Sequence, residues 1–248
     1  MLVNLGPEFS IVIPTLDNPE MVHEIIESLG KQTLLPKEIV FCDSSSSDSV
    51  HNVIKRSNSE ILLTYVRLGR SYRFDRFLKA LFSVNFVKKL FPNYQLVQGR
   101  AFPYEASNHG AQVAHFEWLA FLDASTIPSD NWLEKYWDFV NDNQLDVVFG
   151  NTEYEAHSTF QKLLRASIYG ANGHETAPGS IIRKKQFLEG YRILEGVRSG
   201  GDIAWRDKIK KNLKFTVPKK SYLQYKHLPK DLISCSKKFF IYQLYGSI

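Results

Sequence analysis

The chain has 248 residues, of which 44% are hydrophobic and 23% charged, and its net charge is +5 at neutral pH. These values are typical of a globular protein with a large core, and they exclude a disordered or fibrous chain. No segment approaches the roughly 20 apolar residues of a membrane span, and the start, MLVNLGPEFSIVIPT, lacks the features of a signal peptide. We therefore expect one large or two small α/β domains.

The positive charge is concentrated in the last part of the chain. Residues 183–248 contain 16 Lys or Arg against 5 Asp or Glu, whereas the preceding residues contain 15 against 21. This balance suggests an anionic partner such as a phosphate-rich substrate or an anionic membrane, with a merely solvated surface as the alternative. Nucleic acid is not expected, because no groove-reading or base-stacking motif is present. Cys42 and Cys235 match no metal spacing and fit a reducing compartment.

Short apolar runs alternate with helical patterns through the first 150 residues. The runs predicted as strands are 9–13, 38–42, 61–66, 119–122 and 146–150. The segments with helical spacing are 19–32, 47–57 and 131–143. This alternation predicts a mostly parallel α/β sheet with helices on both faces.

Two stretches depart from this alternation. Residues 71–91, SYRFDRFLKALFSVNFVKKLF, predict an inserted helix with five phenylalanines and basic flanks. Packing of that helix on the core is favoured over a position in a membrane interface. From about residue 177 the pattern becomes irregular, with Gly-rich turns and a helix near 202–211, and we expect an appended region rather than a separate domain.

Polar residues follow three of the predicted strands. Pro14 and Thr15 follow the first strand, Asp43 follows the second, and Asp123 follows the fourth. Open α/β sheets bind ligands outside the carboxyl ends of their strands. No helix begins within one residue of Asp43 or Asp123, so these two acids are candidate ligand-binding residues rather than helix caps.

Three other acids stand close to predicted helix starts. Asp17 precedes the helix of 19–30, Asp48 precedes SVHNVIKR, and Asp202 precedes IAWRDKIKK. A carboxylate at such a position can accept a hydrogen bond from a first-turn N–H group. We interpret Asp17 and Asp48 as N-caps, whereas for Asp202 a cap and a chemical role both remain open.

Several stretches occur in an order that is known from one family: IVIPTLDNPEMVHEIIESLGKQTLLPKEIVFCDSSSSDSV, ASNHGAQVA with Asn108 and Gly110, FLDASTIPSDNWL, and SGGDIAWRDKIKK. Over roughly residues 9–230 the chain resembles the family 2 glycosyltransferases, and with QLYG at 243–246 it is most similar to exopolysaccharide-building members. The resemblance implies one GT-A domain over 1–248, with a nucleotide-binding half to about 130 and an acceptor-side half from about 131.

The resemblance implies a donor and an acceptor as well as a fold. It implies an inverting transfer of a sugar from a nucleotide-diphosphate donor, with a UDP-sugar favoured, to a hydroxyl of a glycan or lipid-linked acceptor. It places Pro14 and Thr15 against the base and ribose, and Asp43 at a base N–H. Asn108 and Arg100 complete the implied nucleotide-binding set. A cytoplasmic protein that contacts the inner face of a membrane fits such an acceptor.

Asp123 matches the first acid of the family's D-x-D motif, which implies a divalent metal, Mn²⁺ or Mg²⁺, at the diphosphate. Such ions prefer oxygen ligands and share them with substrate phosphates. Ser125 stands where the second acid is expected, which predicts weak metal binding, and His227 stands where related enzymes complete the site. Cations such as Arg100 and Arg206 offer a second route to neutralising the diphosphate.

Asp202 matches the second acid of the family's E-D motif, which implies that it is the general base for the acceptor hydroxyl. Gly201 replaces the first acid. Because two motif acids are missing, at 125 and 201, a non-catalytic GT-A-like protein that binds a nucleotide or glycan, or that acts as a scaffold, is the alternative.

Overall fold

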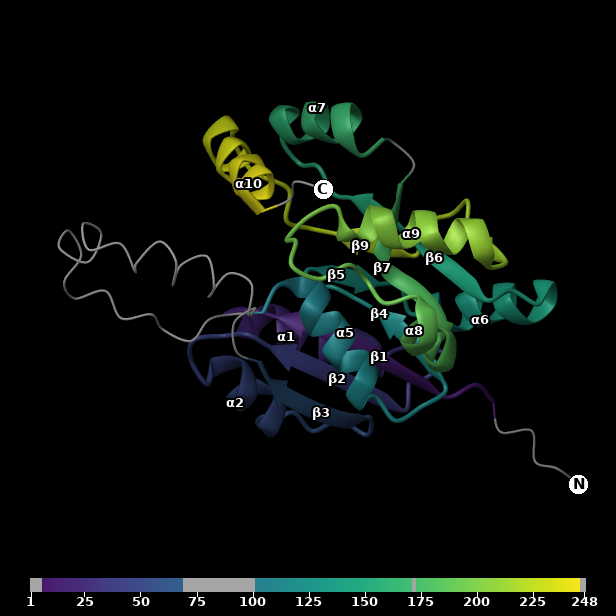
Figure 1. Ribbon diagram of the computed structural model, residues 1–248. Helices are drawn as coiled ribbons and strands as arrows, with labels where there is room; N and C mark the ends of the chain where they lie inside the picture. Colours follow the sequence, from purple (N-terminus) through teal and green to yellow (C-terminus); the bar gives the residue numbers. More distant parts are fainter. Residues whose placement is uncertain (1–5, 69–100, 171–172, 246–248) are drawn as a thin grey trace, which may run out of the picture.

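The computed structural model describes residues 6–68, 101–170 and 173–245 (Figure 1). The predicted helix of residues 71–91 and the candidate Arg100 lie outside the described residues. The described strands are β1 Phe9–Thr15, β2 Glu38–Asp43, β3 Leu62–Arg67, β4 Trp118–Phe121, β5 Thr126–Pro128, β6 Val147–Tyr154, β7 His174–Arg183, β8 Phe215–Thr216 and β9 Leu223–Tyr225. The described helices are α1 Pro19–Gly30, α2 Ser49–Arg56, α5 Pro103–Val113, α6 Trp132–Asn143, α7 Thr159–Ile168, α8 Lys184–Gly190, α9 Gly201–Asn212 and α10 Leu232–Tyr245.

The described strands form one sheet with the order β3-β2-β1-β4-β7-β6-β9-β5, and β8 pairs with β6. The pairs from β3 through β4 are parallel, and β7 runs antiparallel to both of its neighbours, β4 and β6. The order of the parallel strands reverses at β1, which lies between β2 and β4. Ligands of open α/β sheets bind at the carboxyl ends of the strands at such a reversal.

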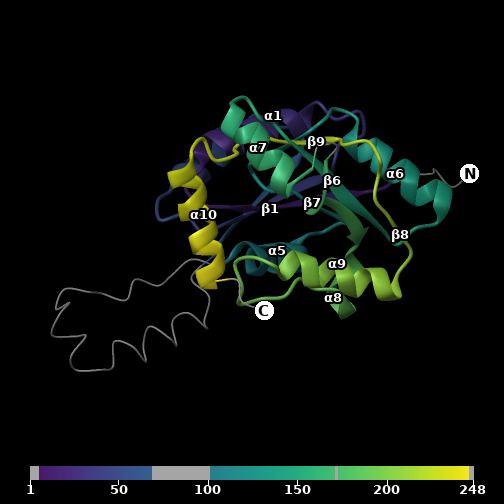
Figure 2. The same ribbon diagram turned by 90° about the horizontal axis from the view of Figure 1, so that it is seen from above.

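Helices cover both faces of the sheet, as the alternating pattern predicts (Figure 2). Figure 2 shows α1 and α6 on one side of the strands and α5, α8 and α9 on the other. In β1, Ile11 and Ile13 face the first layer, whereas Val12 faces the second. This division follows from the two-residue period of a strand, which sends successive side chains to opposite faces.

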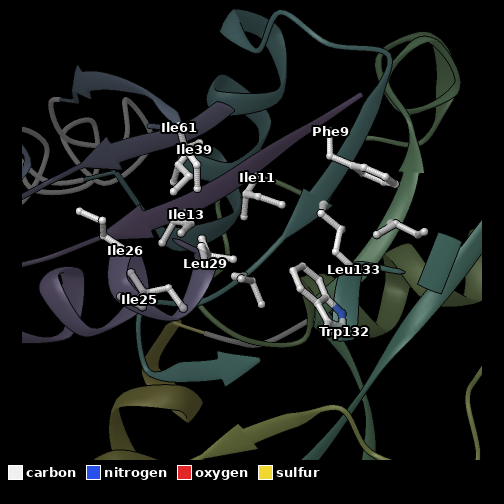
Figure 3. Close-up of a cluster of buried hydrophobic side chains, with 14 of the residues drawn as sticks. Phe9, Ile11, Ile13, Ile25, Ile26, Leu29, Ile39, Ile61, Trp132 and Leu133 are labelled. Atoms are coloured by element: carbon white, nitrogen blue, oxygen red, sulfur yellow. The ribbon is translucent and has the colours of Figure 1, made fainter. Parts of the chain in front are cut away.

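The first core lies between β1, β2 and helices α1 and α6 (Figure 3). Ile25 and Leu29 of α1 and Trp132 and Leu133 of α6 are fully buried against it. Each such side chain contributes roughly 1.5–3 kcal/mol through removal of its apolar surface from water. This packing holds the strands whose ends carry the site.

The second core brings α5 unusually close to β1 and β2. A Cβ atom at Gly110 of α5 would lie 2.5 Å from Cγ1 of Val12 and 2.8 Å from Sγ of Cys42. Only glycine permits that approach, because any side chain would displace the helix from the sheet. The Gly110 in the ASNHGAQVA stretch therefore has a packing role.

The region after residue 177 is more regular than the sequence predicts. The expected helix near 202–211 is confirmed as α9, but the expectation of irregular structure is wrong for residues 177–190, because β7 occupies a central place in the sheet and α8 follows it at once. The fully buried Ile181 and Ile182 show why this strand is central. Pro178 and Gly179 mask a strand whose pairing partners, β4 and β6, are distant in the sequence.

The two predicted helix caps are corrected by the structure. Asn18, not Asp17, is the N-cap of α1, and the Asp17 carboxylate accepts hydrogen bonds from the N–H and hydroxyl of Ser46. Asp48 does stand at the N-cap of α2, but its side chain makes no capping bond and pairs with Arg67 instead. Both acids tie the loop after β2 to its neighbours.

α10 stands outside the two helical layers, beyond the strand ends (Figure 1). No helix among the described residues is both long enough and apolar enough to cross a membrane. Leu232 and Ile233 are each 70% exposed and Phe240 is 65% exposed, so the outer side of α10 presents apolar surface.

Candidate functional site

A pocket of about 750 Å³ opens at the point where the strand order reverses. Its floor includes Pro14 and Thr15 from the end of β1 and Asp123 from the loop after β4. Asp202 from the first turn of α9 lies on its wall. Four of the residues predicted from the sequence therefore meet in one cavity, although they are up to 188 positions apart in the chain.

Asp123 lines the pocket. Among the described residues, no group donates a hydrogen bond to its carboxylate, and only its backbone carbonyl accepts one, from Thr126. Burial raises the pKa of Asp123 to about 6, the negative charge of Asp202 adds to the rise, and Lys238 opposes it. A carboxylate that accepts no hydrogen bond from the described residues and lies near a second acid is placed to bind a ligand.

Asp202 is held by two side chains. The Tyr104 hydroxyl, from the first turn of α5, donates a hydrogen bond of 2.9 Å to Oδ1 of Asp202. Oδ2 of Asp202 lies 3.5 Å from a guanidinium nitrogen of Arg206, one helical turn further along α9. Gly200, not Asp202, occupies the N-cap of α9, so the simple cap interpretation of Asp202 is wrong.

Gly201, which stands where the family motif has an acid, has no space for a side chain. A Cβ atom there would lie 2.7 Å from Cδ2 of Tyr104 and 3.0 Å from the carbonyl oxygen of Leu194. The Tyr104 ring thus fills the volume that a longer side chain would need. The close packing at Gly201 and the contact between Tyr104 and Asp202 therefore belong to one local arrangement.

Asp43 lies beneath the pocket wall rather than in its lining. It is fully buried, and its carboxylate accepts hydrogen bonds from the Thr15 hydroxyl, from the N–H and hydroxyl of Ser45, and from the Tyr65 hydroxyl. The hydrogen bond from Thr15 fixes the side chain of that pocket-lining residue. Direct contact of Asp43 with a base stays a prediction.

The side chain of Asn108 is also hydrogen-bonded to other residues of the protein. Its amide donates to the Ile193 carbonyl at 2.7 Å and to the Glu195 carboxylate at 3.0 Å, while its side-chain oxygen accepts from the Ile193 N–H. The side chain is 1% exposed and does not line the pocket. Asn108 therefore fastens the loop before α9 to α5, and a nucleotide contact stays an untested prediction.

The residues expected to hold a metal do not assemble a site. His227 is exposed, its ring stands edge-on to Tyr225, and it does not line the pocket. Within residues 6–68, 101–170 and 173–245, no group of three or more His, Cys, Asp or Glu side chains is placed to share an ion. Asp123 supplies one carboxylate and Ser125 a neutral hydroxyl, so this donor set does not fit a resident divalent metal.

Two cations line the pocket that sequence reasoning missed. Arg198 lies in the loop before α9, and Lys238 lies on α10. Burial lowers the pKa of Lys238, and the nearby Asp123 carboxylate partly restores it. Arg198 could have been found from the sequence, because it lies four residues before the candidate base Asp202 in a glycine-containing loop. No local signal could have revealed Lys238, because only the path of the chain brings α10 back to the pocket.

Three tyrosines form another part of the pocket wall. The rings of Tyr154 and Tyr169 stack with centroids 4.0 Å apart, and Tyr225 lies 5.2 Å from Tyr154. All three line the pocket. Flat aromatic faces edged by hydroxyl groups present both apolar contact area and hydrogen-bonding groups to a ligand.

One known family has a sequence profile that matches this chain. The sequence profile described as "Glycosyl transferase family 2" matches residues 10–79 and 88–202, which is most of the chain. The chain belongs to glycosyl transferase family 2. The family match includes Thr15, Asp123 and Asp202, the residues that meet in the pocket.

The curated relatives share only a low sequence identity with the chain. The chain is 22% identical over 217 residues to "Glycosyltransferase AglE" of Haloferax volcanii, covering 80% of this chain and 60% of that protein. It is 24% identical over 148 residues to a "PGL/p-HBAD biosynthesis glycosyltransferase" of Mycobacterium tuberculosis, covering 59% and 47%. The chain thus spans about half to three fifths of the length of these relatives.

Solved structures confirm the GT-A fold. The crystal structure of S. aureus TarS 1-349 in complex with UDP-GlcNAc superposes with a TM-score of 0.61 at 18% identity, over 92% of this chain and 60% of that one. The complex of the same protein with UDP has the same TM-score at 16% identity, over 96% and 65%. At this identity the likeness concerns the fold.

Proposed function

We propose that the chain transfers a sugar from a nucleoside-diphosphate donor to an acceptor hydroxyl, with inversion at the anomeric carbon. The observation that carries this proposal is the meeting of Thr15, Asp123 and Asp202 in one pocket at the strand reversal of a family 2 domain. A solved structure of the same fold binds UDP-GlcNAc, which makes a UDP-sugar the first donor to test.

The chemistry follows from the position of Asp202. Its carboxylate takes the proton of the acceptor hydroxyl while that oxygen attacks the anomeric carbon. The bond from that carbon to the diphosphate oxygen breaks, and its electron pair leaves with the diphosphate. One displacement from the opposite side inverts the configuration. The Tyr104 hydrogen bond and the Arg206 contact orient the carboxylate for this role.

Divalent metal use is common in this family, and Mn²⁺ or Mg²⁺ held through Asp123 and the donor phosphates stays a prediction. The metal would neutralise charge on the leaving diphosphate. Because the described residues do not supply a fitting donor set, no step of the reaction above is assigned to it.

The three tyrosines of the pocket wall are the proposed contact for the acceptor. Tyr154, Tyr169 and Tyr225 offer aromatic faces of the kind on which sugar rings lie, which supports a glycan acceptor. Membership of the exopolysaccharide-building group would fit such an acceptor and stays a prediction.

A lipid-linked acceptor would bring the protein to a membrane surface. The exposed Leu232, Ile233 and Phe240 of α10, together with the excess of Lys and Arg after residue 183, support contact with anionic lipid. Co-sedimentation with anionic and neutral vesicles tests this idea. Binding to anionic vesicles that is lost when the three apolar residues become serine would support it, whereas no binding to either vesicle would refute it.

A non-catalytic nucleotide- or glycan-binding protein is the second candidate. It is favoured by the engagement of both Asp202 oxygens and by Gly201 in place of a motif acid. Calorimetric titration with UDP, GDP and dTDP, followed by incubation with UDP-GlcNAc and other UDP-sugars, separates the two. Nucleotide binding with release of UDP from a UDP-sugar supports the transferase. Binding without release favours the second candidate, and no binding refutes both nucleotide-based proposals.

A further inference from the structure

The two cations in the pocket wall come from the basic last part of the chain. Arg198 is half-buried, and among the described residues it forms no hydrogen bond or ion pair with the protein. Lys238 is half-buried on the pocket side of α10, with its ammonium group 5.3 Å from the centroid of the Tyr225 ring. It also interacts electrostatically with Asp123. The two charges thus approach the cavity from separate elements.

The other cations close to the site are engaged by carboxylates of the protein. Arg206 lies 2.9 Å from a carboxylate oxygen of Glu175 and 3.5 Å from Asp202, and Lys210 lies 2.8 Å from Glu175. Neither side chain lines the pocket. Arg206, which the sequence suggested as a phosphate contact, therefore has a structural partner. Arg198 and Lys238 are the arginine and lysine that line the described pocket.

A diphosphate in this pocket needs positive charge near it. Asp123 and Asp202 both line the cavity, and two carboxylates repel an anionic ligand. The repulsion grows in the reaction, because the leaving diphosphate gains negative charge. Among the described residues no group of three or more metal-ligating side chains is placed to share an ion, whereas two side-chain cations line the pocket and can supply compensating charge.

We propose that Arg198 and Lys238 neutralise the diphosphate of the donor, so that donor binding does not require a divalent cation. This inference rests on the proposed function. A guanidinium group can bind two phosphate oxygens at once through its planar set of donors, and an ammonium group binds as a point charge. In this arrangement Asp123 attracts Lys238 toward the pocket, which is the alternative to the metal-ligand role of Asp123 considered under the proposed function.

The test is calorimetric titration of UDP into the purified chain, with MnCl₂ or with EDTA. Arg198→Met and Lys238→Met remove each charge while keeping much of the side-chain length. Arg192→Met and Lys237→Met are matched controls, since both residues are exposed neighbours that do not line the pocket. Circular dichroism checks that each variant is folded.

The proposal predicts that EDTA changes the Kd of the unmodified chain for UDP by less than about twofold. Each pocket variant should raise Kd by about tenfold, as expected for the loss of one charge-assisted contact, and the double variant should raise it further than either single variant. UDP binding that EDTA abolishes, or pocket variants that bind like the controls, would overturn the inference and leave the transferase proposal standing. Absence of UDP binding by the unmodified chain under every condition would contradict the donor assignment itself.

Discussion

The Tyr104 hydroxyl donates a hydrogen bond of 2.9 Å to the Asp202 carboxylate and joins the first turns of α5 and α9. The same ring lies against Gly201, at the position where the family motif carries an acid. One side chain thus orients the proposed base and occupies the space of the missing acid. Tyr104 is therefore a positioning residue for the proposed reaction.

Tyr104→Phe removes the hydroxyl and keeps the ring over Gly201. We expect kcat for UDP release from a UDP-sugar to fall about tenfold, because a hydrogen bond to a charged group contributes about 1.5 kcal/mol. The Kd for UDP should change by less than about twofold, since the hydroxyl that is removed contacts the Asp202 carboxylate. A variant with unchanged kcat would show that the bond has no positioning role.

Gly201→Ala tests the close packing at the start of α9. The added methyl group would meet the Tyr104 ring at 2.7–2.8 Å, so we expect a loss of about 1–3 kcal/mol in the free energy of unfolding. Urea unfolding measures the loss. Gly30→Ala is the matched control, since a methyl group there would have no neighbouring atom within 4 Å and alanine favours a helix. Equal stability of the two variants would contradict the packing account.

Asn108→Ala tests whether this residue is structural. Its side chain makes two buried and one partly buried hydrogen bond with the loop before α9, so we expect a loss of about 2–4 kcal/mol in the free energy of unfolding. Gln112→Ala, on an exposed position of the same helix, should change stability by less than about 0.5 kcal/mol. A stable Asn108→Ala variant with greatly weakened UDP binding would instead favour the nucleotide role that the resemblance implies.

Glu38 gives a pH-dependent prediction far from the pocket. Burial raises the pKa of Glu38, but hydrogen bonds from Thr64, the His115 N–H and Ser10 outweigh it and hold that pKa below its usual value. A lowered carboxyl pKa stabilises the fold above the unfolded-state pKa, near 4.5, and the stabilisation disappears as the pH falls through the folded-state pKa.

Glu38→Gln should therefore lower the free energy of unfolding by about 1.5–3 kcal/mol at pH 7. The difference from the unmodified chain should shrink steadily as the pH is lowered from about 5. The exposed Glu60→Gln is the control and should have little effect at either pH. A destabilisation by Glu38→Gln that is the same at pH 7 and at pH 3.5 would refute the electrostatic explanation.

The parallel half of the fold could be predicted because its signals are local. β1 and β2 each contain a short apolar run, and α1 has an amphipathic pattern. Each of these signals can be recognised within a few neighbouring residues. β7 was missed because its place depends on pairing with β4 and β6, and its glycine and proline conceal that pairing. Strand propensity depends on tertiary context more than helix propensity does.

The candidate site shows the same division. Thr15, Asp123 and Asp202 could be identified because each stands directly at the end or start of a recognisable element. Asp43 and Asn108 do not line the pocket, and sequence alone could not show that the protein's own hydrogen bonds occupy them. Lys238 could not be predicted, because its approach to Asp123 arises only when α10 folds back over the pocket.

The central claim is that Asp202 is the base of a sugar transfer. The most direct measurement is the rate of UDP release from a UDP-sugar by Asp202→Asn, compared with the unmodified chain and with Asp207→Asn, an exposed acid on the same helix. We predict that Asp202→Asn lowers this rate by at least about 100-fold with UDP affinity within about twofold, and that Asp207→Asn behaves normally. An Asp202→Asn variant that keeps the unmodified rate would contradict the claim.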